Sequence, residues 1–207
     1  MIITGPRVTE KLIAQLLKEH NINLGLCNKG THYPLGELTR KVQSGEIELI
    51  SVEKGHRLEI KQRFVIVRVL HVKPNLSVEE LYETCTIFYD GSQIRRHAHG
   101  LSGIHNNQRP LEATAREVVF QSIGQSEPRF TFIKLGRFTK KQDRNETLVT
   151  DRSHVWYGIR VVVERIHFDL IIPRFYYKEE YTKRVSGLDG KTWKTTYFSW
   201  RAVSGML

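Results

Sequence analysis

A run of cationic side chains between residues 95 and 116 has the chemistry of an anion site. Its members are Arg95, Arg96, His97, His99, Arg109 and Arg116. Guanidinium groups donate several hydrogen bonds in a planar fork that matches phosphate and carboxylate oxygens. His97 and His99 would share one face of a strand, which also fits a metal pair, but no cysteine or carboxylate lies close in sequence to complete such a site. The cluster therefore favours a phosphate-bearing ligand over a metal ion.

Aromatic side chains that interleave with cations in the C-terminal part could form the other half of a nucleotide site. Aromatic rings stack on bases, while neighbouring cations neutralise phosphates. The residues selected for stacking are Trp156, Tyr176 and Trp193. The same alternation is expected of strands whose aromatic residues face a core and whose cations face solvent, so both interpretations stay open.

The stretch from Gly103 to Gly124 predicts a loop followed by the helix that would position the arginines. Pro110 suits the first helical position, where its missing N–H is not needed. Apolar residues recur at helical spacing and form one narrow face for packing on a sheet. They are Leu111, Ala115, Val118 and Val119. Glu112 and Arg116 stand four positions apart, a spacing that allows an ion pair on the outer surface.

This loop and helix resemble the Nudix box of nucleoside-diphosphate-linked pyrophosphohydrolases in a degenerate form. The first and last glycines of that pattern are 21 positions apart, as Gly103 and Gly124 are. In the same register Val119 falls on the aliphatic position and Ala115 on the small residue that precedes the family's arginine. The resemblance implies a Nudix-like α+β fold, with a mixed β-sheet flanked by helices, in residues 61–207.

The metal-binding acids of the box are missing from this stretch. The family's glutamate pair falls on Gln121 and Ser122, which carry no charge. A second register, which aligns Arg116 and Glu117 with the family's Arg-Glu, also lacks the pair. Mg²⁺ is held by carboxylates and substrate phosphates, and pyrophosphate hydrolysis of this kind needs the metal. The resemblance therefore implies the fold without the standard catalysis, with no metal and no cofactor.

A working pyrophosphohydrolase with displaced ligands is one alternative, and Mg²⁺ would then be its cofactor. Glu112 and Glu117 are the only acids in the helix, and five residues apart they are separated by about 140° around its axis. A third acid would have to converge with one of them. The candidates are Glu127, Glu164 and Asp169. The other alternative is a basic nucleic-acid-binding protein of unrelated fold.

Charge is distributed unevenly along the 207 residues. The formal net charge is +10, of which residues 1–60 carry about +1 and residues 61–207 carry +9. This excess favours a phosphate-bearing partner, either a nucleotide or nucleic acid. No apolar run reaches the length of a membrane helix, and no secretory signal is evident, so a membrane partner is not expected. With two separated cysteines, Cys27 and Cys85, the chain is expected to be cytoplasmic.

Hydrophobic periodicity and turn residues predict two domains. Residues 1–60 are expected to form an N-terminal helical extension or small module, and residues 61–207 the α+β domain. Asp90-Gly91 and Asp189-Gly190 mark two hairpins. The expected helices cover 8–20 and 35–42, with a capped helical turn at 77–82. The expected strands cover 46–52, 58–60, 63–72, 84–89, 92–96, 130–138, 154–172, 181–185 and 192–200, with an interruption of the long one near Glu164 and Arg165 and an exposed loop at 140–150.

The function expected from these observations is that of a sensor or adaptor that binds a nucleotide or a nucleoside-diphosphate-type ligand. The identity of the ligand, the oligomeric state and the distance between Cys27 and Cys85 are left open by the sequence.

Overall fold

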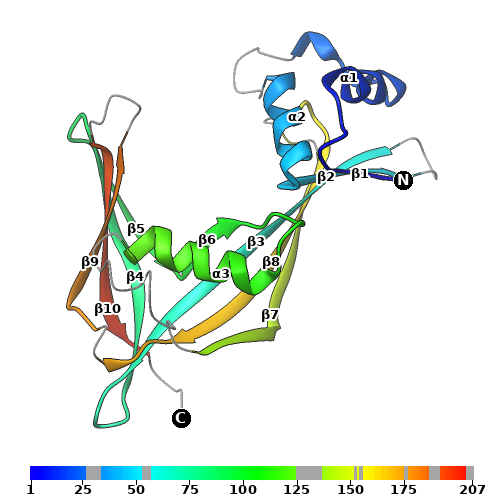
Figure 1. The fold of residues 1–207 in the computed structure, drawn as a ribbon. Coiled ribbons are helices and arrows are strands. Elements are labelled where there is room, and N and C mark those ends of the chain that lie inside the picture. The colour runs from blue at the N-terminus through cyan, green and yellow to red at the C-terminus, as the bar shows by residue number, and fades with distance from the viewer. Residues whose placement is uncertain are drawn as a thin grey trace. The chain divides into compact units, whose positions relative to one another are not determined.

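The computed structural model describes residues 1–26, 34–52, 57–124, 137–151, 153, 156–174, 177–186 and 192–203. These residues contain three α-helices and a large, mainly antiparallel sheet of ten strands (Figure 1), so the predicted combination of helices and sheet is confirmed. The chain divides into two compact units. Unit 1 comprises Met1–Phe64, Ile104–Leu111 and Asn145–Ile166, and unit 2 comprises Val65–Gly103, Glu112–Arg144 and His167–Leu207.

Unit 1 contains two α-helices, a short 3₁₀ helix and a small antiparallel group of strands. These elements are β1(Ile2–Ile3), α1(Glu10–Glu19), η1(Leu24–Leu26), α2(Leu35–Ser44), β2(Ile47–Val52) and the first part of β3(Arg57–Val72). Thr9 caps α1 by accepting a hydrogen bond from the Leu12 amide at 3.2 Å. Gly45 ends α2 in the left-handed conformation, with φ of 79°. Whether residues 1–60 fold as an independent extension stays a prediction.

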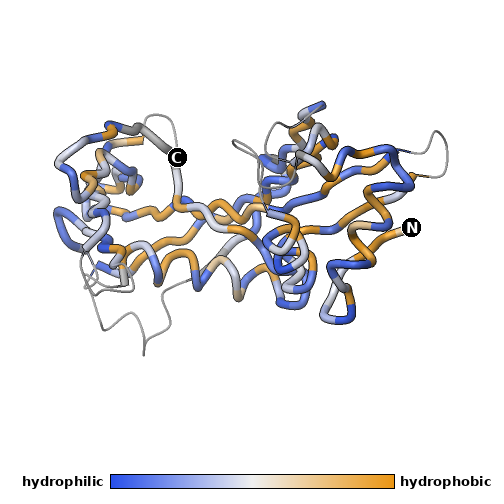
Figure 2. The backbone as a smooth tube through the Cα atoms, turned by 90° about the horizontal axis from the view of Figure 1, so that it is seen from above, coloured by the Kyte–Doolittle hydropathy of each residue, from blue (hydrophilic) through white to orange (hydrophobic). Residues whose placement is uncertain are grey.

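The core of unit 1 is apolar and is formed by both helices and the strands beneath them. Ile13 and Leu17 of α1, Leu38 of α2 and Leu49 of β2 are fully buried, and Trp156 packs in the same cluster. Figure 2 shows hydrophobic and hydrophilic residues alternating along several strands, as expected for strands with one buried face.

Unit 2 is built around antiparallel strands in the order β3–β4–β10–β9, with β5 also paired to β4. Its elements include β4(Val78–Phe88), β5(Gln93–His99), β9(Glu180–Ser186) and β10(Thr192–Ala202). The hairpins predicted at Asp90-Gly91 and between residues 181–185 and 192–200 are confirmed by the pairings β4–β5 and β9–β10. Strands β7(Arg137–Thr150) and β8(Arg160–Ile171) pair with each other and contribute residues to both units.

The predicted loop and helix are present, with the loop Ile104–Leu111 in unit 1 and the helix from Glu112 onward in unit 2. Strand β6(Leu101–Ile104) leads to α3(Leu111–Val119), which continues as a π-helical turn, η2(Phe120–Gly124). A Cβ added to Gly103 would lie only 2.5 Å from Cγ2 of Val118, so β6 and α3 are in close contact. The first glycine of the box-like stretch is therefore required by packing.

Three sequence-based predictions of secondary structure were wrong. Residues 78–82 belong to strand β4; Ser77, just before it, bonds Asn75 instead of capping a helix, and Glu80 pairs with Arg68. Residues 140–150 form most of β7 although many of their side chains are exposed. The long strand predicted at 154–172 begins only at Arg160, after a turn in which Tyr157 and Gly158 have positive φ, and it has no break near residue 164. The strand predicted at 130–138 lies mostly outside the described residues.

Candidate anion-binding site

The register of three strands in unit 2 aligns polar side chains on one face of the sheet. Thr196 of β10 lies opposite Thr86 of β4 on one side and opposite Lys183 of β9 on the other. Lys194 lies two residues from Thr196 on β10 and opposite Phe88 of β4, so it projects from the same face. The hydroxyls of Thr86 and Thr196 are 2.9 Å apart and share a buried hydrogen bond.

These side chains form the floor of a pocket of about 210 Å³, which we call the lysine pocket. It is lined by Glu83, Thr86, Phe88, Gly100, Leu101, Ser102, Ser122, Lys183, Lys194, Thr196 and Phe198. The lining includes two ammonium groups, four hydroxyl groups and a single carboxylate. Such a set of donors, with one surplus positive charge, fits an anion.

The electrostatic environment of Lys183 supports this assignment. Burial lowers the pKa of Lys183, the nearby charge of Lys194 lowers it further, and Glu83 acts in the opposite direction. An ammonium group that has lost water and faces a second cation is stabilised when an anion enters. A single anion in the pocket could therefore interact with the ammonium groups of both lysines.

Glu83 reaches the lysine pocket because of a β-bulge. Tyr197 pairs with Cys85 but Phe198 pairs with Glu83, so Thr84 is an extra residue on β4. The Thr84 hydroxyl donates to the carbonyl oxygen of Tyr197 at 3.0 Å. Glu83 consequently lies on the same side as Thr86, whose hydroxyl donates to Oε1 of Glu83 at 3.0 Å.

Ser122 links the pocket to the box-like helix. It is buried, with 6% of its surface exposed, and it belongs to the π-helical turn η2. Turns of this kind are rare and often occur at functional sites. In the predicted register Ser122 occupies a position where the Nudix pattern has a metal-binding glutamate, and in the structure it lines the same pocket as Lys183 and Lys194.

Trp193, 48% exposed, neighbours two residues of the lysine pocket, Phe88 and Lys194, and is an extra residue on β10 where the register with β9 shifts between Thr192 and Lys194. Its ring meets the ring of Phe88 edge to face, with centroids 6.1 Å apart. Nζ of Lys194 lies 5.4 Å from the centroid of Trp193, a cation–π distance. Of the selected aromatic residues that the structure describes, Trp156 and Trp193, Trp193 is the one beside this pocket.

The other predicted stacking residues have different environments. Trp156 is 5% exposed in the core of unit 1, where it also lines a pocket of about 310 Å³ with Phe64 and Ile104. Tyr176 lies outside the described residues. Their roles in ligand binding stay predictions.

The predicted arginine and histidine cluster is divided between the two units. Arg109 belongs to unit 1 and is exposed, whereas Arg95 and Arg116 belong to unit 2. Arg116 makes an ion pair of 2.7 Å with Glu112 on the surface of α3. The backbones of Arg96, His97 and His99 lie in β5, and their side chains are outside the described part of the structure. Phosphate binding by this cluster stays a prediction.

The acids considered for catalysis that the structure describes have partners within the chain. Glu112 pairs with Arg116, and Glu117 accepts a hydrogen bond of 2.9 Å from Gln121. Glu164 pairs with Lys61 and Arg63 at 2.6 and 2.8 Å, and Asp169 pairs with cations of β3 and β7. Glu127 lies outside the described residues, which contain no group of three or more metal-ligating side chains. A catalytic role for Glu112 and Glu117 stays a prediction.

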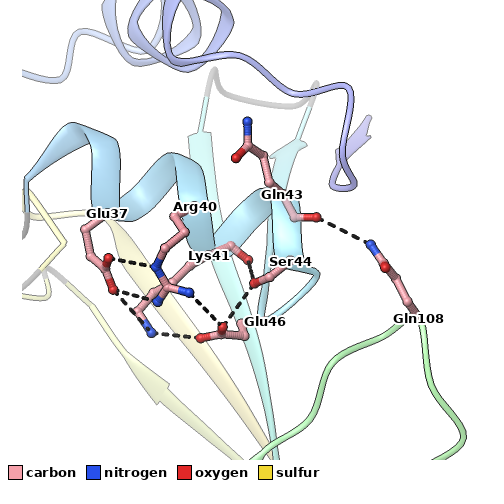
Figure 3. Close-up of polar contacts among 7 residues, drawn as sticks. All are labelled: Glu37, Arg40, Lys41, Gln43, Ser44, Glu46 and Gln108. Atoms are coloured by element: carbon pink, nitrogen blue, oxygen red, sulfur yellow. Dashed lines mark hydrogen bonds and ion pairs between the residues drawn. The ribbon is translucent and has the colours of Figure 1, made fainter. Parts of the chain in front are cut away.

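A second polar cluster, in unit 1, contrasts with the lysine pocket (Figure 3). Arg40 donates to Glu37 at 2.8 Å, and Lys41 donates to Glu46 at 2.9 Å. Ser44 also donates to Glu46, at 3.0 Å. The two cations are balanced by two carboxylates, so this cluster has no surplus charge to attract a ligand and serves to hold the end of α2.

Lys183, Lys194, Thr86, Thr196 and Ser122 were not selected from the sequence. The available signals were the turn predicted at Asp189-Gly190, which lies outside the described residues, and the alternation of residues 194, 196 and 198; the predicted pairing of the flanking strands is the one that β9 and β10 make. The contribution of β4 depends on a pairing between residues more than 100 positions apart, which no local pattern specifies.

Comparisons with known proteins give weak results. No protein-family model matches this chain, and no curated protein matches it. Among solved structures, a Caenorhabditis elegans Ap4A hydrolase is 11% identical, with a TM-score of 0.33, and the match covers 68% of this chain and 80% of that one. A binary complex of a C. elegans Ap4A hydrolase is 12% identical, with a TM-score of 0.29, covering 54% and 68%. At these values the Nudix-like assignment stays a proposal.

No helix among the described residues has both the length and the apolar character needed to cross a lipid bilayer.

Proposed function

We propose that the protein binds a nucleotide or nucleoside-diphosphate-type ligand in the lysine pocket and acts as a sensor or adaptor of Nudix-like fold. The observation that carries this proposal is the convergence of Lys183 and Lys194 on a row of threonine hydroxyls within one pocket. The phosphates would accept hydrogen bonds from both ammonium groups and from the hydroxyl of Ser122.

The size of the pocket indicates which part of such a ligand would lie inside it and which part outside. A volume of about 210 Å³ is below the range of roughly 300–1,000 Å³ that is typical for whole small-molecule ligands. We therefore place one or two phosphate groups inside the pocket and the base outside it. Trp193 is exposed beside two residues of the pocket and offers a face for stacking.

The same residues favour binding without hydrolysis. Two ammonium groups can offset the charge of a diphosphate, which is part of what a divalent cation does in a pyrophosphohydrolase. They cannot lower the pKa of a bound water as a metal ion does. Since Gln121 and Ser122 stand where the box pattern has carboxylates, the proposal includes no Mg²⁺-dependent turnover.

Calorimetric titration with ADP and with pyrophosphate tests the proposal. Each titration is run with Mg²⁺ and with EDTA, and released products are followed by chromatography. We expect binding without product release. Lys183→Gln and Lys194→Gln should each weaken both ligands by roughly 10- to 100-fold, the value of a hydrogen bond to a charged group. Trp193→Ala should weaken ADP but not pyrophosphate.

Lys140→Gln is the matched control, because Lys140 is exposed on β7 and its removal changes the net charge equally. It should leave both affinities within about two-fold. Pyrophosphate binding that is equally strong in Lys183→Gln and Lys140→Gln would refute the site. Mg²⁺-dependent release of product from ADP or a dinucleotide would refute the absence of hydrolysis.

A further inference from the structure

A second pocket in unit 2 lies on the opposite face of the same strands. On β10, Lys194, Thr196 and Phe198 project toward the lysine pocket, so Arg201, an odd number of residues away, projects from the other face. Arg201 lies opposite Glu80 of β4 and packs over the ring of Tyr82 at 5.5 Å.

This second pocket, of about 340 Å³, is dominated by cations. Its lining residues are Ile66, Arg68, Glu80, Arg144, His167 and Arg201. We call it the arginine pocket. Three guanidinium groups and an imidazole face a single carboxylate in this lining, so the pocket has a clear positive excess.

Among the described side chains, a further acid, Asp169, is shared among several cations of this network. Asp169 contacts Arg144 at 3.4 Å, Lys141 at 3.8 Å and Arg68 at 3.9 Å. Charge-assisted N–H···O bonds are usually about 2.7–2.9 Å, so all three contacts are long and weak. The Asp169 carboxylate is thus shared by three cations, and each of the three N···O distances is longer than that of a strong ion pair.

The positions of these groups suit an entering ligand. Arg68 is held by buried Glu80 at 3.1 Å, and its own side chain is only 11% exposed. Arg144 and Lys141 are 31% and 36% exposed, so their ends can turn from Asp169 toward an anion without leaving β7. The pocket lining thus combines a fixed guanidinium, Arg68, with an adjustable one, Arg144, and Lys141 shares the Asp169 carboxylate with both.

From this arrangement we infer that the arginine pocket is a second anion site, independent of the lysine pocket, that binds a phosphoryl group. Guanidinium forks match the oxygens of a tetrahedral phosphoryl group and form two parallel hydrogen bonds with it. The phosphoryl group could belong to a small molecule or to the backbone of a nucleic acid, and the test below separates these two sources.

The experiment is a titration of inorganic phosphate into the full chain carrying Lys183→Gln and Lys194→Gln, which removes the cations of the first pocket. Phosphate should still bind. Adding Arg144→Gln should weaken binding by roughly 10-fold or more, the loss of a charged hydrogen bond. Adding Lys140→Gln, one residue from Lys141 on the same strand, should have little effect. Equal affinity in these two variants would overturn the inference.

A variant that is expected to raise the phosphate affinity shows that the loss of affinity in Arg144→Gln does not come from a general loss of structure. Asp169→Asn removes the carboxylate that competes for Arg144 and Lys141, so phosphate should bind more tightly in a variant whose circular dichroism is unchanged. Weaker binding in this folded variant would overturn the inference.

A short oligothymidylate titrated into the same variants identifies the source of the phosphoryl group. If Arg144→Gln weakens the oligonucleotide more than Lys140→Gln does, the pocket accepts a phosphodiester backbone. If only free phosphate responds, the ligand is a small molecule. If both variants lose the same affinity for the oligonucleotide and neither changes the affinity for free phosphate, binding depends only on the general positive charge of the surface, and the proposal is refuted. Failure of nucleotide binding in the lysine pocket would leave these results unaffected.

Discussion

At the scale of single residues, the protonation of Lys183 should determine how anion binding in the lysine pocket depends on pH. Burial and the charge of Lys194 lower the pKa of Lys183 from its ordinary value of 10.5. An anion binds more tightly to the protonated amine of Lys183 than to the neutral one. The affinity for the anion should therefore be highest at pH values below the pKa that Lys183 has in the ligand-free protein, and it should fall as pH rises through that pKa. Calorimetry with sulfate, which does not titrate between pH 7 and 10.5, measures this profile.

Lys183→Gln provides the comparison for that profile. Its sulfate affinity should be lower and should not decline over the pH range in which the unmodified protein loses affinity. A profile that declines over the same pH range in both proteins would show that Lys183 is not the titrating group.

Glu164 offers a test of pH-dependent stability in unit 1. Burial alone would raise its pKa, but hydrogen bonds and charge from Lys61 and Arg63 outweigh burial and lower the pKa below the ordinary 4.5. A lowered folded-state pKa stabilises the protein above the unfolded pKa, and this contribution is lost as pH falls through the folded value. Glu164→Gln should therefore cost about 1 kcal/mol at pH 7.

Urea unfolding of both proteins at several pH values measures that difference. It should shrink as pH falls below about 4.5 and vanish below the folded-state pKa of Glu164. A difference that stays constant down to pH 3 would contradict the ion pairs as its origin.

At the level of elements, the contact between β6 and α3 depends on a missing side chain. The Cβ of Gly103→Ala would lie 2.5 Å from Cγ2 of Val118, so the helix or the strand must shift. Overpacking of this kind costs about 1–3 kcal/mol. Thermal and urea unfolding should show this loss, and Val118→Ala in the same chain should recover part of it.

Gly36→Ala is the control, because Gly36 lies in α2 and the nearest atom to an added Cβ is Oε2 of Glu10 at 3.5 Å. This change should stabilise the protein by up to about 1 kcal/mol through helix propensity. If the effects of Gly103→Ala and Val118→Ala simply added, the close contact would not be the cause.

Elements that depend on local signals could be predicted, and those that depend on distant partners could not. The periodic apolar face of residues 111–119 and the turn at Asp90-Gly91 predicted α3 and the β4–β5 hairpin. Strand β7 was missed because its polar residues resemble a loop until β8 supplies its hydrogen bonds. The lysine pocket was missed for the same reason, since its floor combines β4 with two strands from the end of the chain.

For the whole molecule, the net charge of +10 predicts two kinds of salt dependence. Non-specific binding of an oligonucleotide releases many counterions, so its affinity should fall steeply between low and physiological salt. Pyrophosphate in a partly enclosed pocket engages few cations and should lose much less affinity. Titrations at several salt concentrations give both slopes, and equal slopes would contradict a defined small-ligand site.

The β-bulge at Thr84 means that related proteins could differ in the charge of the lysine pocket through a change in chain length alone. In a strand without the extra residue, Glu83 and Thr86 would project from opposite faces of the sheet. Deleting Thr84 would therefore remove the one carboxylate of the lysine pocket without replacing any amino acid that lines it. In a comparison of related sequences, a single gap at this position, with every named side chain conserved, would mark a change in the charge of ligand that the pocket accepts.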